Sequence, residues 1–319
     1  MTCASIALLL GLLSTMLSFG QSANESTTPS SSGSQASSTL SVDVDLVLLS
    51  TTVTDSRNRH VTGLGKENFQ VWEDKIEQEI QYFSSEDLPL SVGMIFDVSG
   101  SMGDKLTAAR LAASTFMRMG ERDDEYFLVE FSDSPHIVES FTTDTSKLQS
   151  RLLLTHAKGA TSLYDALYLG LEQVSRGNNS RKALLLITDG EDNHSRYSFS
   201  DVKEFAKEHD VQIYAIGIVD ASSAQLGGYQ GRALLEDLAN LTGGRAFFPA
   251  SVYELEGICA QIGTDLKNQY VIGYRSLNRS NDGKWRKVRV KVNRAKGTPA
   301  LSVRAKTGYY ASTIAKVMK

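Results

Sequence analysis

The sequence predicts an α/β protein: a doubly wound, mostly parallel sheet that is inserted in a small antiparallel β-sandwich. Two patterns lead to this prediction. Between residues 88 and 266, short apolar strands alternate with amphipathic helices, as in a sheet whose two faces are both covered. On either side of that segment, apolar residues recur at every second position, which is typical of strands with one buried face.

The chain begins with an uncharged apolar run, ASIALLLGLLSTMLSF, which is followed by small residues. We expect residues 1–20 to be a cleaved secretory signal peptide, with an uncleaved membrane anchor as the alternative. Residues 21–40, QSANESTTPSSSGSQASSTL, have too few apolar side chains to form a core, so we expect a disordered Ser-rich linker. The predicted location is therefore exported, whether periplasmic, associated with the cell envelope or extracellular.

Residues 41–87 are expected to form the first strands of the β-sandwich. In SVDVDLVLLSTTV the residues Val42, Val44, Leu46 and Leu48 lie on one face of a strand. NFQVWED and EQEIQYFS continue the period of two, and the polar segments DSRNR and EDKIE separate the strands.

Residues 88–266 are expected to form the α/β domain. Its strands are predicted at SVGMIF, YFLVEF, HIVESF, KALLLIT, VQIYAIGI and AFFP, and its helices at residues 104–119, 162–176, 200–209, 231–241 and 252–266. In YFLVEFSDSPHIVESF two strands follow each other with a turn and no helix between them. This segment predicts one antiparallel edge strand in the otherwise parallel sheet. Cys259, in the apolar pattern LEGICAQIG, is expected to be a buried side chain without a disulfide.

Residues 267–312 return to a period of two and are expected to complete the β-sandwich, followed by a tail at 313–319. Residues 267–319 hold 14 Lys and Arg against the single acid Asp282, net +13, so residues 1–266 carry −17 of the total of −4. This asymmetry predicts that the basic strands dock against the acidic part or contact an anionic envelope surface. The simpler alternative is a solvated edge, with Lys287, Arg289 and Lys291 facing outward from their strand.

Three polar loops are predicted at the carboxyl ends of the parallel strands, where ligands bind in such sheets. DVSGSM, residues 97–102, follows SVGMIF, and TDGEDN, residues 188–193, follows ALLLI. GATSLYDAL places Thr161 directly before a helix. Hydroxyl and carboxylate oxygens suit Mg²⁺ or a similar divalent ion and disfavour Zn²⁺ and copper.

These three segments resemble the loops of the metal-ion-dependent adhesion site in von Willebrand factor type A domains, and the resemblance covers residues 88–266. It implies Ser99, Ser101 and Thr161 as direct metal ligands, with Asp97 and Asp189 holding the ion largely through waters. The implied cofactor is Mg²⁺, with Mn²⁺ or Ca²⁺ as alternatives. The flanks, including the closing VRAKTGYYA, resemble an exported acidobacterial family of proteins related to von Willebrand factor type A.

These residues are also compatible with other roles. Asp97 and Ser99 are also compatible with a simple Asx turn, and Asp165 is better explained as a structural residue at a helix start. A catalytic triad of Ser99 or Ser101, His194 and Asp189 is conceivable, but the sequence has no G-x-S-x-G nucleophile elbow. The five histidines have no second His or Cys at metal spacing.

We therefore expect a non-catalytic binding protein that holds one divalent cation and contacts a protein partner through it. The partner is expected to present an Asp or Glu carboxylate to the metal, and no nucleic-acid partner is expected. The alternatives are a metal-dependent hydrolase that uses the same ion, and a structural envelope protein whose metal stabilises loops.

Overall fold

The computed structural model describes residues 46–189, 192–218, 227–293 and 300–313. All of them belong to one compact unit, Val44–Lys319. The predicted signal peptide, the predicted linker and residues 314–319 of the predicted tail lie outside the described residues.

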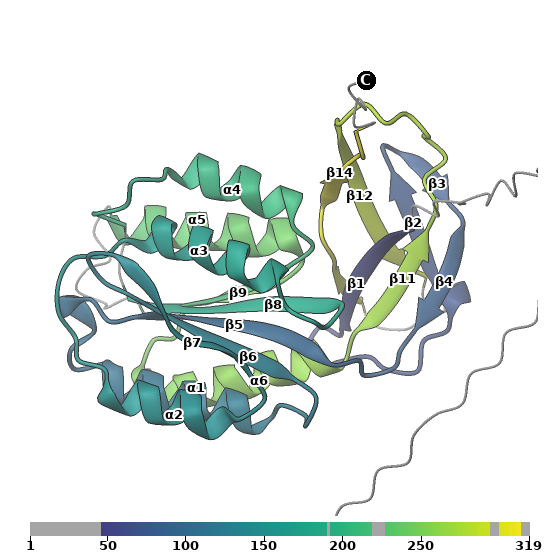
Figure 1. Ribbon diagram of the computed structural model, residues 1–319. Coiled ribbons are helices and arrows are strands. Elements are labelled where there is room, and N and C mark those ends of the chain that lie inside the picture. The colour runs from purple at the N-terminus through teal and green to yellow at the C-terminus, as the bar shows by residue number, and fades with distance from the viewer. Residues whose placement is uncertain (1–45, 190–191, 219–226, 294–299, 314–319) are drawn as a thin grey trace, which may run out of the picture. The chain divides into compact units, whose positions relative to one another are not determined.

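The α/β segment forms a six-stranded sheet with the strand order β10-β9-β8-β5-β6-β7 (Figure 1). The strands are β5 (Leu90–Asp97), β6 (Glu125–Phe131), β7 (Pro135–Thr142), β8 (Arg181–Thr188), β9 (Gln212–Gly217) and β10 (Arg245–Phe247). All neighbours pair in parallel except β7, which pairs antiparallel with β6 at the edge of the sheet. The predicted antiparallel edge strand is confirmed. Because β5 and β8 are adjacent and parallel, their carboxyl ends lie at the same edge.

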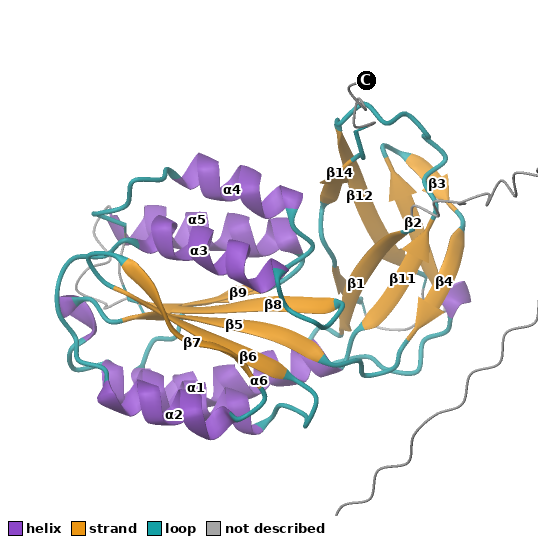
Figure 2. Cartoon of the chain, in the orientation of Figure 1, coloured by secondary structure: helices purple, strands orange, loops and turns teal. Residues whose placement is uncertain are grey.

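Helices cover both faces of this sheet (Figure 2). One face carries α1 (Leu106–Arg118), α2 (Thr145–Leu154) and α6 (Leu255–Lys267); the other carries α3 (Leu163–Ser175), α4 (Phe199–Glu208) and α5 (Gly227–Thr242). Along β5, Met94 and Phe96 belong to the first apolar core and Ile95 to the second. Both faces of the strand are therefore buried, which explains its continuous apolar sequence.

The structure adds one helix, α2, that the sequence pattern does not predict. Only Leu148 and Leu152 of this helix are buried, whereas Leu153 and Leu154 are 71% and 70% exposed. Asp144 begins the helix, since its carboxylate accepts a hydrogen bond from the backbone N–H of Ser146 at 3.1 Å. Two buried positions in ten residues are too few to give a clear helical period. The other helices lie where the sequence predicts them, within about one turn at each end.

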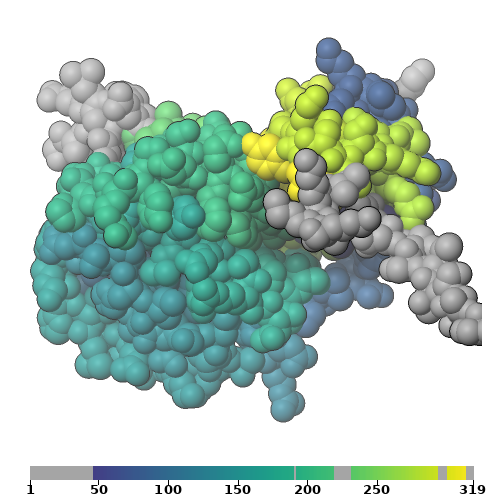
Figure 3. All heavy atoms as spheres, turned by 45° about the horizontal axis from the view of Figure 1, so that its top comes forward, coloured from purple at the N-terminus to yellow at the C-terminus, as the bar shows by residue number. Residues whose placement is uncertain are grey.

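Strands from both flanks form two four-stranded antiparallel sheets. The first contains β13 (Ser302–Arg304), β1 (Val47–Thr54), β11 (Tyr270–Tyr274) and β4 (Ile80–Ser84), in that order. The second contains β14 (Gly308–Tyr310), β12 (Trp285–Val292), β2 (Phe69–Glu73) and β3 (Ile76–Gln78). Since β1 pairs with β11 and β2 with β12, the chain before the α/β segment and the chain after it share both sheets. Figure 3 shows these segments, in blue and in lime, adjoining on one surface.

The two sheets share one apolar core. It includes Leu49 of β1 and Ile272 of β11 from the first sheet, and Val71 of β2 and Val288 of β12 from the second. The aromatic rings of Phe69 and Tyr270 also meet here, with centroids 5.0 Å apart. The period of two in the flanks therefore reflects strands that turn alternate side chains into this core. In β1, however, the buried face carries Leu49, whereas Leu48, on the predicted apolar face, is 37% exposed. Val42 and Val44 of the predicted face lie outside the described residues.

Polar side chains fill the contact between α6 and the flanking strands. Asp265 of α6 has a fully buried side chain, with His60 Nε2 at 2.8 Å and Arg304 Nη2 at 2.6 Å. Nearby, Gln269 donates to the side-chain oxygen of Gln212 in β9 at 2.8 Å. These contacts fasten the end of α6 to both the six-stranded sheet and the flanking sheets.

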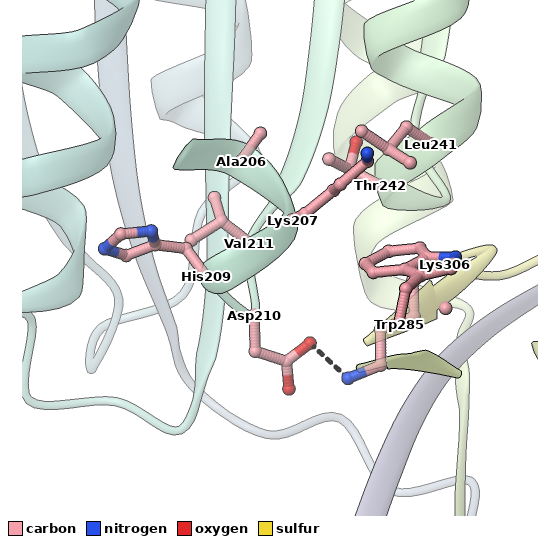
Figure 4. Close-up of a pocket in the computed structure, with 10 residues that line it drawn as sticks. Ala206, Lys207, His209, Asp210, Val211, Leu241, Thr242, Trp285 and Lys306 are labelled. Carbon is pink, nitrogen blue, oxygen red and sulfur yellow. Dashed lines mark hydrogen bonds and ion pairs between the residues drawn. The ribbon is translucent and has the colours of Figure 1, made fainter. Parts of the chain in front are cut away.

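A small pocket adjoins this contact (Figure 4). Lys207, His209 and Trp285 are among the residues that line it, and Lys306 Nζ lies 2.9 Å from Asp210 Oδ1 at its side. Its volume of about 10 Å³ is that of a single water site, so it cannot hold a small-molecule ligand. Within the described ranges, no helix is both long enough and apolar enough to cross a bilayer.

Candidate metal centre

Three loops meet at the carboxyl edge of the six-stranded sheet. The loop after β5 is tied to the loop before α3, because Gly100 N–H donates to Gly159 O at 3.0 Å and Lys158 N–H donates to Val98 O at 2.8 Å. Gly159 has φ +83°, and a Cβ atom there would lie 2.7 Å from the carboxylate of Asp133. This position therefore requires glycine, both for its backbone conformation and for space.

Asp97, the last residue of β5, is fully buried. Its Oδ1 accepts the backbone N–H of Ser99 at 2.8 Å, and its Oδ2 accepts the Thr188 hydroxyl at 2.5 Å. Burial raises the pKa of Asp97 above its ordinary value, and the nearby Asp189 adds to the rise. The first hydrogen bond is that of an Asx turn, whereas the second comes from β8 and joins two of the three loops.

Ser99, Ser101 and Asp189 form a chain of oxygen atoms next to Asp97. The hydroxyl of Ser101 donates to Asp189 Oδ1 at 2.8 Å, and the hydroxyls of Ser99 and Ser101 lie 3.1 Å apart. A hydroxyl has one hydrogen, so if Ser101 donates to Asp189, Ser99 must donate to Ser101. Four of the five predicted site residues are thus brought together from loops about 90 residues apart in the chain.

Thr161, the fifth predicted residue, is held by its backbone. Its N–H donates to Asn193 Oδ1 at 2.9 Å, and its carbonyl accepts the N–H groups of Asn193 and His194 at 3.0 and 3.2 Å. Thr161 is 3% exposed. Among the hydrogen bonds of the described residues, none links its hydroxyl to the other four. The structure therefore joins its loop to the loop after β8 through the backbone of Thr161, which contacts both main-chain and side-chain atoms of that loop.

Lys105 is a member of this site that sequence reasoning missed. Its Nζ lies 2.5 Å from Asp189 Oδ2 and donates to the carbonyl of Ser101 at 3.3 Å. The only sequence signal is a lysine four residues after Ser101 at the start of α1. Lys105 supplies the positive charge that faces Asp189 in this structure.

Two side chains hold the loop after β8 to the start of α3, and sequence reasoning missed one of them, Ser195. The hydroxyl of Ser195 accepts the N–H groups of Tyr164 and Asp165 at 3.0 and 3.1 Å. Asp165, in turn, accepts the N–H groups of Arg196 and Tyr197 at 2.9 and 3.1 Å. Asp165 is therefore structural, as the sequence suggests, but it binds the backbone of the opposite loop.

The donor set suits a hard divalent cation. All five side chains offer hydroxyl or carboxylate oxygens, the ligand type that Mg²⁺, Mn²⁺ and Ca²⁺ prefer. The described part of the chain contains no group of three or more His, Cys, Asp or Glu placed to hold a metal. Any ion at this edge would thus depend on the three hydroxyls in addition to the two aspartates.

The chain matches the model of a known family. The family model described as von Willebrand factor type A domain matches residues 92–259, just over half of the chain. The matched range includes all three loops of the candidate centre.

Two curated relatives are similar over part of their length. An uncharacterized protein of Synechocystis sp. is 29% identical over 111 residues, which are 34% of this chain and 26% of that protein. Calcium-activated chloride channel regulator 3A-1 of Mus musculus is 26% identical over 166 residues, 49% of this chain and 17% of that protein. The chain thus spans about a quarter or less of these relatives.

Solved structures with a similar backbone include three bacterial proteins. The PilB minor pilin from Streptococcus sanguinis has a TM-score of 0.48 at 15% identity, covering 58% of this chain and 63% of that one. The vWF domain of the type V pili tip protein Mfa5 from Porphyromonas gingivalis has a TM-score of 0.46 at 14% identity, covering 56% and 97%. A von Willebrand factor type A protein from Catenulispora acidiphila has a TM-score of 0.49 at 12% identity, covering 84% and 74%.

Proposed function

The chain belongs to the von Willebrand factor type A domain family, and we propose that it binds one divalent cation and uses it to hold a protein partner. The observation that supports this proposal best is the chain of oxygens from Ser99 through Ser101 to Asp189, beside the buried Asp97. In this proposal the site is an adhesion site rather than a catalytic one.

The five side chains of the site would hold Mg²⁺, Mn²⁺ or Ca²⁺ in two ways. Ser99, Ser101 and Thr161 would be direct ligands, and Asp97 and Asp189 would act largely through waters. Asp97 also fixes the loop, since its two oxygens hold Ser99 N–H and the Thr188 hydroxyl. When bound, the ion would supply a positive charge at the carboxyl edge of the sheet.

A partner carboxylate is the ligand that this arrangement would favour. The proposed direct ligands are neutral hydroxyls, so the ion would keep most of its charge. An Asp or Glu of the partner would gain a charge-assisted contact in a partly dry crevice, where attraction is stronger than in bulk water.

A hydrolase is less favoured by the same contacts. The serines hydrogen-bond to each other and to Asp189. In the described part of the chain, the ring of His194 makes no hydrogen bond to either serine, and only its backbone N–H contacts the site, at Thr161. These contacts support a role of the hydroxyls as metal ligands rather than as nucleophiles activated by a base.

Export is part of the same proposal. The apolar residues 1–20 would direct the chain out of the cytoplasm, and an adhesion site would then face partners in the envelope or outside the cell. The resemblance of the flanks to exported acidobacterial proteins supports this location.

The test is metal-dependent stability, measured before any partner is known. Melting temperature is followed while MgCl₂ or MnCl₂ is added, and binding to the folded state alone should add about 2.7 kcal/mol at one hundred times Kd. Thr161→Ala and Ser101→Ala should lose most of this gain. Ser150→Ala, which removes an exposed hydroxyl on α2, should keep it. A gain of the same size in all three variants would place the ion elsewhere.

The partner is tested next, by capture from an envelope extract with and without chelator. The captured protein should be lost on chelation and should bind less after one of its Asp or Glu residues is changed to the amide. If no such change weakens metal-dependent binding, the carboxylate bridge is wrong and the metal keeps a structural role.

A further inference from the structure

Six of the basic residues after Lys267 fall into two groups. Arg286, Arg304 and Lys306 pair with Asp282, Asp265 and Asp210 at 2.8, 2.6 and 2.9 Å. Lys287, Arg289 and Lys291 are exposed, and in the described part of the chain they form no ion pair. Arg304 and Lys306 thus contact aspartates of the acidic part, as predicted, whereas Arg286 pairs within the basic part. The second group remains available to an outside anion.

The three free cations form a row on β12. They occupy alternate positions, so their side chains leave the same face of the strand, about 7 Å apart from one to the next. The residue between the first two, Val288, is buried in the core of the two sheets. Lys291 Nζ lies 5.0 Å from the centre of the Trp72 ring on the neighbouring strand, which holds this cation over the sheet.

Two exposed apolar side chains lie at the end of the sheets where this row begins. Ile76 follows the turn between β2 and β3 and is 57% exposed, and Leu277 follows β11 and is 66% exposed. Their two loops adjoin, since Leu277 N–H donates to Gln78 Oε1 at 3.0 Å. The exposed cation Lys75 is the last residue of the turn before Ile76.

These loops are held firmly. The buried carboxylate of Glu73 accepts hydroxyls from Ser276 at 2.6 Å, Tyr274 at 2.8 Å and Tyr309 at 2.9 Å. Asp74 accepts the N–H of Lys287 at 3.0 Å and thereby fixes the turn to the start of β12. These hydrogen bonds therefore hold Ile76 and Leu277 in exposed positions. Loops that only contact solvent would not need to be fixed in this way.

We infer that this end of the flanking sheets docks on an anionic lipid bilayer. Ile76 and Leu277 enter the headgroup region, while Lys75, Lys287 and Arg289 contact the anionic lipids. Membrane-surface binding combines buried apolar area with electrostatic attraction, at about 1 kcal/mol for each cation near the surface. A soluble polyanion would need only the row of cations, so the pair of exposed apolar side chains favours a bilayer.

Acidic residues beside this surface leave it with a positive charge. Asp282 is paired with the buried Arg286, whereas Asp74 keeps its charge, since the backbone N–H of Lys287 that it accepts is neutral. Two more exposed carboxylates oppose the cations: Glu77 of β3, which lies opposite Trp72 of β2, and Glu79. Against these three carboxylates stand the four cations Lys75, Lys287, Arg289 and Lys291, which leaves a net charge of +1. None of these residues belongs to the candidate metal centre, so the inference is independent of the proposed function.

Flotation with liposomes of phosphatidylglycerol and phosphatidylcholine tests the inference on the full chain at low salt. Vesicles of phosphatidylcholine alone control for binding through the apolar residues 1–20, which needs no anionic lipid. The anion-dependent fraction should fall at least tenfold in Lys287→Glu/Arg289→Glu. It should fall several-fold in Ile76→Ser/Leu277→Ser, and it should decrease for the wild type as salt rises.

Matched controls come from the α/β segment. Arg122→Glu/Lys147→Glu changes the net charge equally at exposed positions, and Leu153→Ser/Leu154→Ser removes two exposed leucines. Both should bind as the wild type does, and unchanged melting curves verify that every variant folds. The inference is overturned if anionic vesicles do not float the chain, or if the controls lose as much binding as the test variants. It is also overturned if only the charge reversal matters and a soluble acidic polysaccharide competes fully.

Discussion

Two aspartates, Asp97 and Asp265, have fully buried side chains but very different partners. Asp97 ends β5 at the carboxyl edge of the six-stranded sheet, and its hydrogen-bond donors are a backbone N–H and a hydroxyl. Asp265 lies near the end of α6 and faces Arg304 at 2.6 Å and His60 at 2.8 Å. One carboxylate has neutral partners only, and the other has two basic partners.

Burial raises the pKa of both carboxyl groups, but different interactions oppose this rise in the two cases. For Asp265 the opposing influences are the charges of Arg304, His60 and Arg245. For Asp97 they are hydrogen bonds alone, and the like charge of Asp189 raises the pKa further. A buried carboxylate without a cation is costly, so sites of this kind tend to be functional. The contrast indicates that Asp265 is a structural link, whereas Asp97 is suited to a cation from outside.

Replacing Asp265 should have the largest effect on stability. Asp265→Asn removes the charge that compensates Arg304 in a buried contact, and breaking a buried pair by removing one partner costs about 3 to 5 kcal/mol. Urea unfolding of the metal-free protein should show this loss as a lower midpoint with an unchanged slope.

The matched control is Asp210→Asn, which removes the partner of Lys306 in the same region. The Asp210 side chain is 66% exposed, so its loss should cost less than about 1 kcal/mol. Equal losses of unfolding free energy in the two variants would mean that a buried ion pair stabilises this protein no more than an exposed one. The contrast between Asp97 and Asp265, which depends on burial, would then be wrong.

Replacing Asp97 by Asn should act in the opposite direction in the metal-free protein. The amide can still accept Ser99 N–H and can donate to the Thr188 oxygen, while the buried charge is removed. We expect a gain on the order of 1 kcal/mol near neutral pH, together with loss of the stabilisation by Mn²⁺.

The pH dependence has a definite sign. The raised pKa of Asp97 means that the folded state takes up the proton more readily than the unfolded state, whose value is near 3.8. The metal-free wild type should therefore gain stability from this group as pH falls through its raised pKa, and Asp97→Asn should lack that contribution. Melting curves of both proteins across this range measure the difference. A variant that is less stable than the wild type at neutral pH would contradict the assignment.

The sequence predicts local features of this site well, because they are local in the chain. Asp97, Ser99 and Ser101 lie within five residues, directly after an apolar strand, and Asp189 follows another such strand. The partners that complete the arrangement are distant: Lys105 is 84 residues from Asp189, and Ser195 is 31 residues from Tyr164. A lysine at a helix start or a serine in a loop has no distinctive pattern, so only the packing of the sheet edge reveals its role.

The helix α2 and the contact of Asp265 with Arg304 were unpredictable for related reasons. In α2 the apolar spacing is obscured, because Leu153 and Leu154 are exposed. Asp265 lies in α6, and its basic partners, His60 and Arg304, come from the flanking segments. Only the tertiary structure brings these segments next to the helix. Periodicity therefore identifies the strands and most of the helices, but not the ionic contacts between them.

Replacing Lys105 gives the sharpest test of which charge Asp97 and Asp189 are suited to. Its ammonium group lies 2.5 Å from Asp189, and both side chains are almost fully buried. If this cation and a metal ion act on the same carboxylate, removing it should strengthen metal binding. Lys105→Met keeps the length of the side chain and should tighten Mn²⁺ binding about tenfold, which corresponds to about 1.4 kcal/mol. Isothermal titration with MnCl₂ measures this change, and Lys203→Met, which breaks the exposed pair with Asp237, should leave the affinity unaltered. A weaker affinity in Lys105→Met would show that the lysine orients Asp189 for the ion, so that the two cations cooperate at this edge of the sheet.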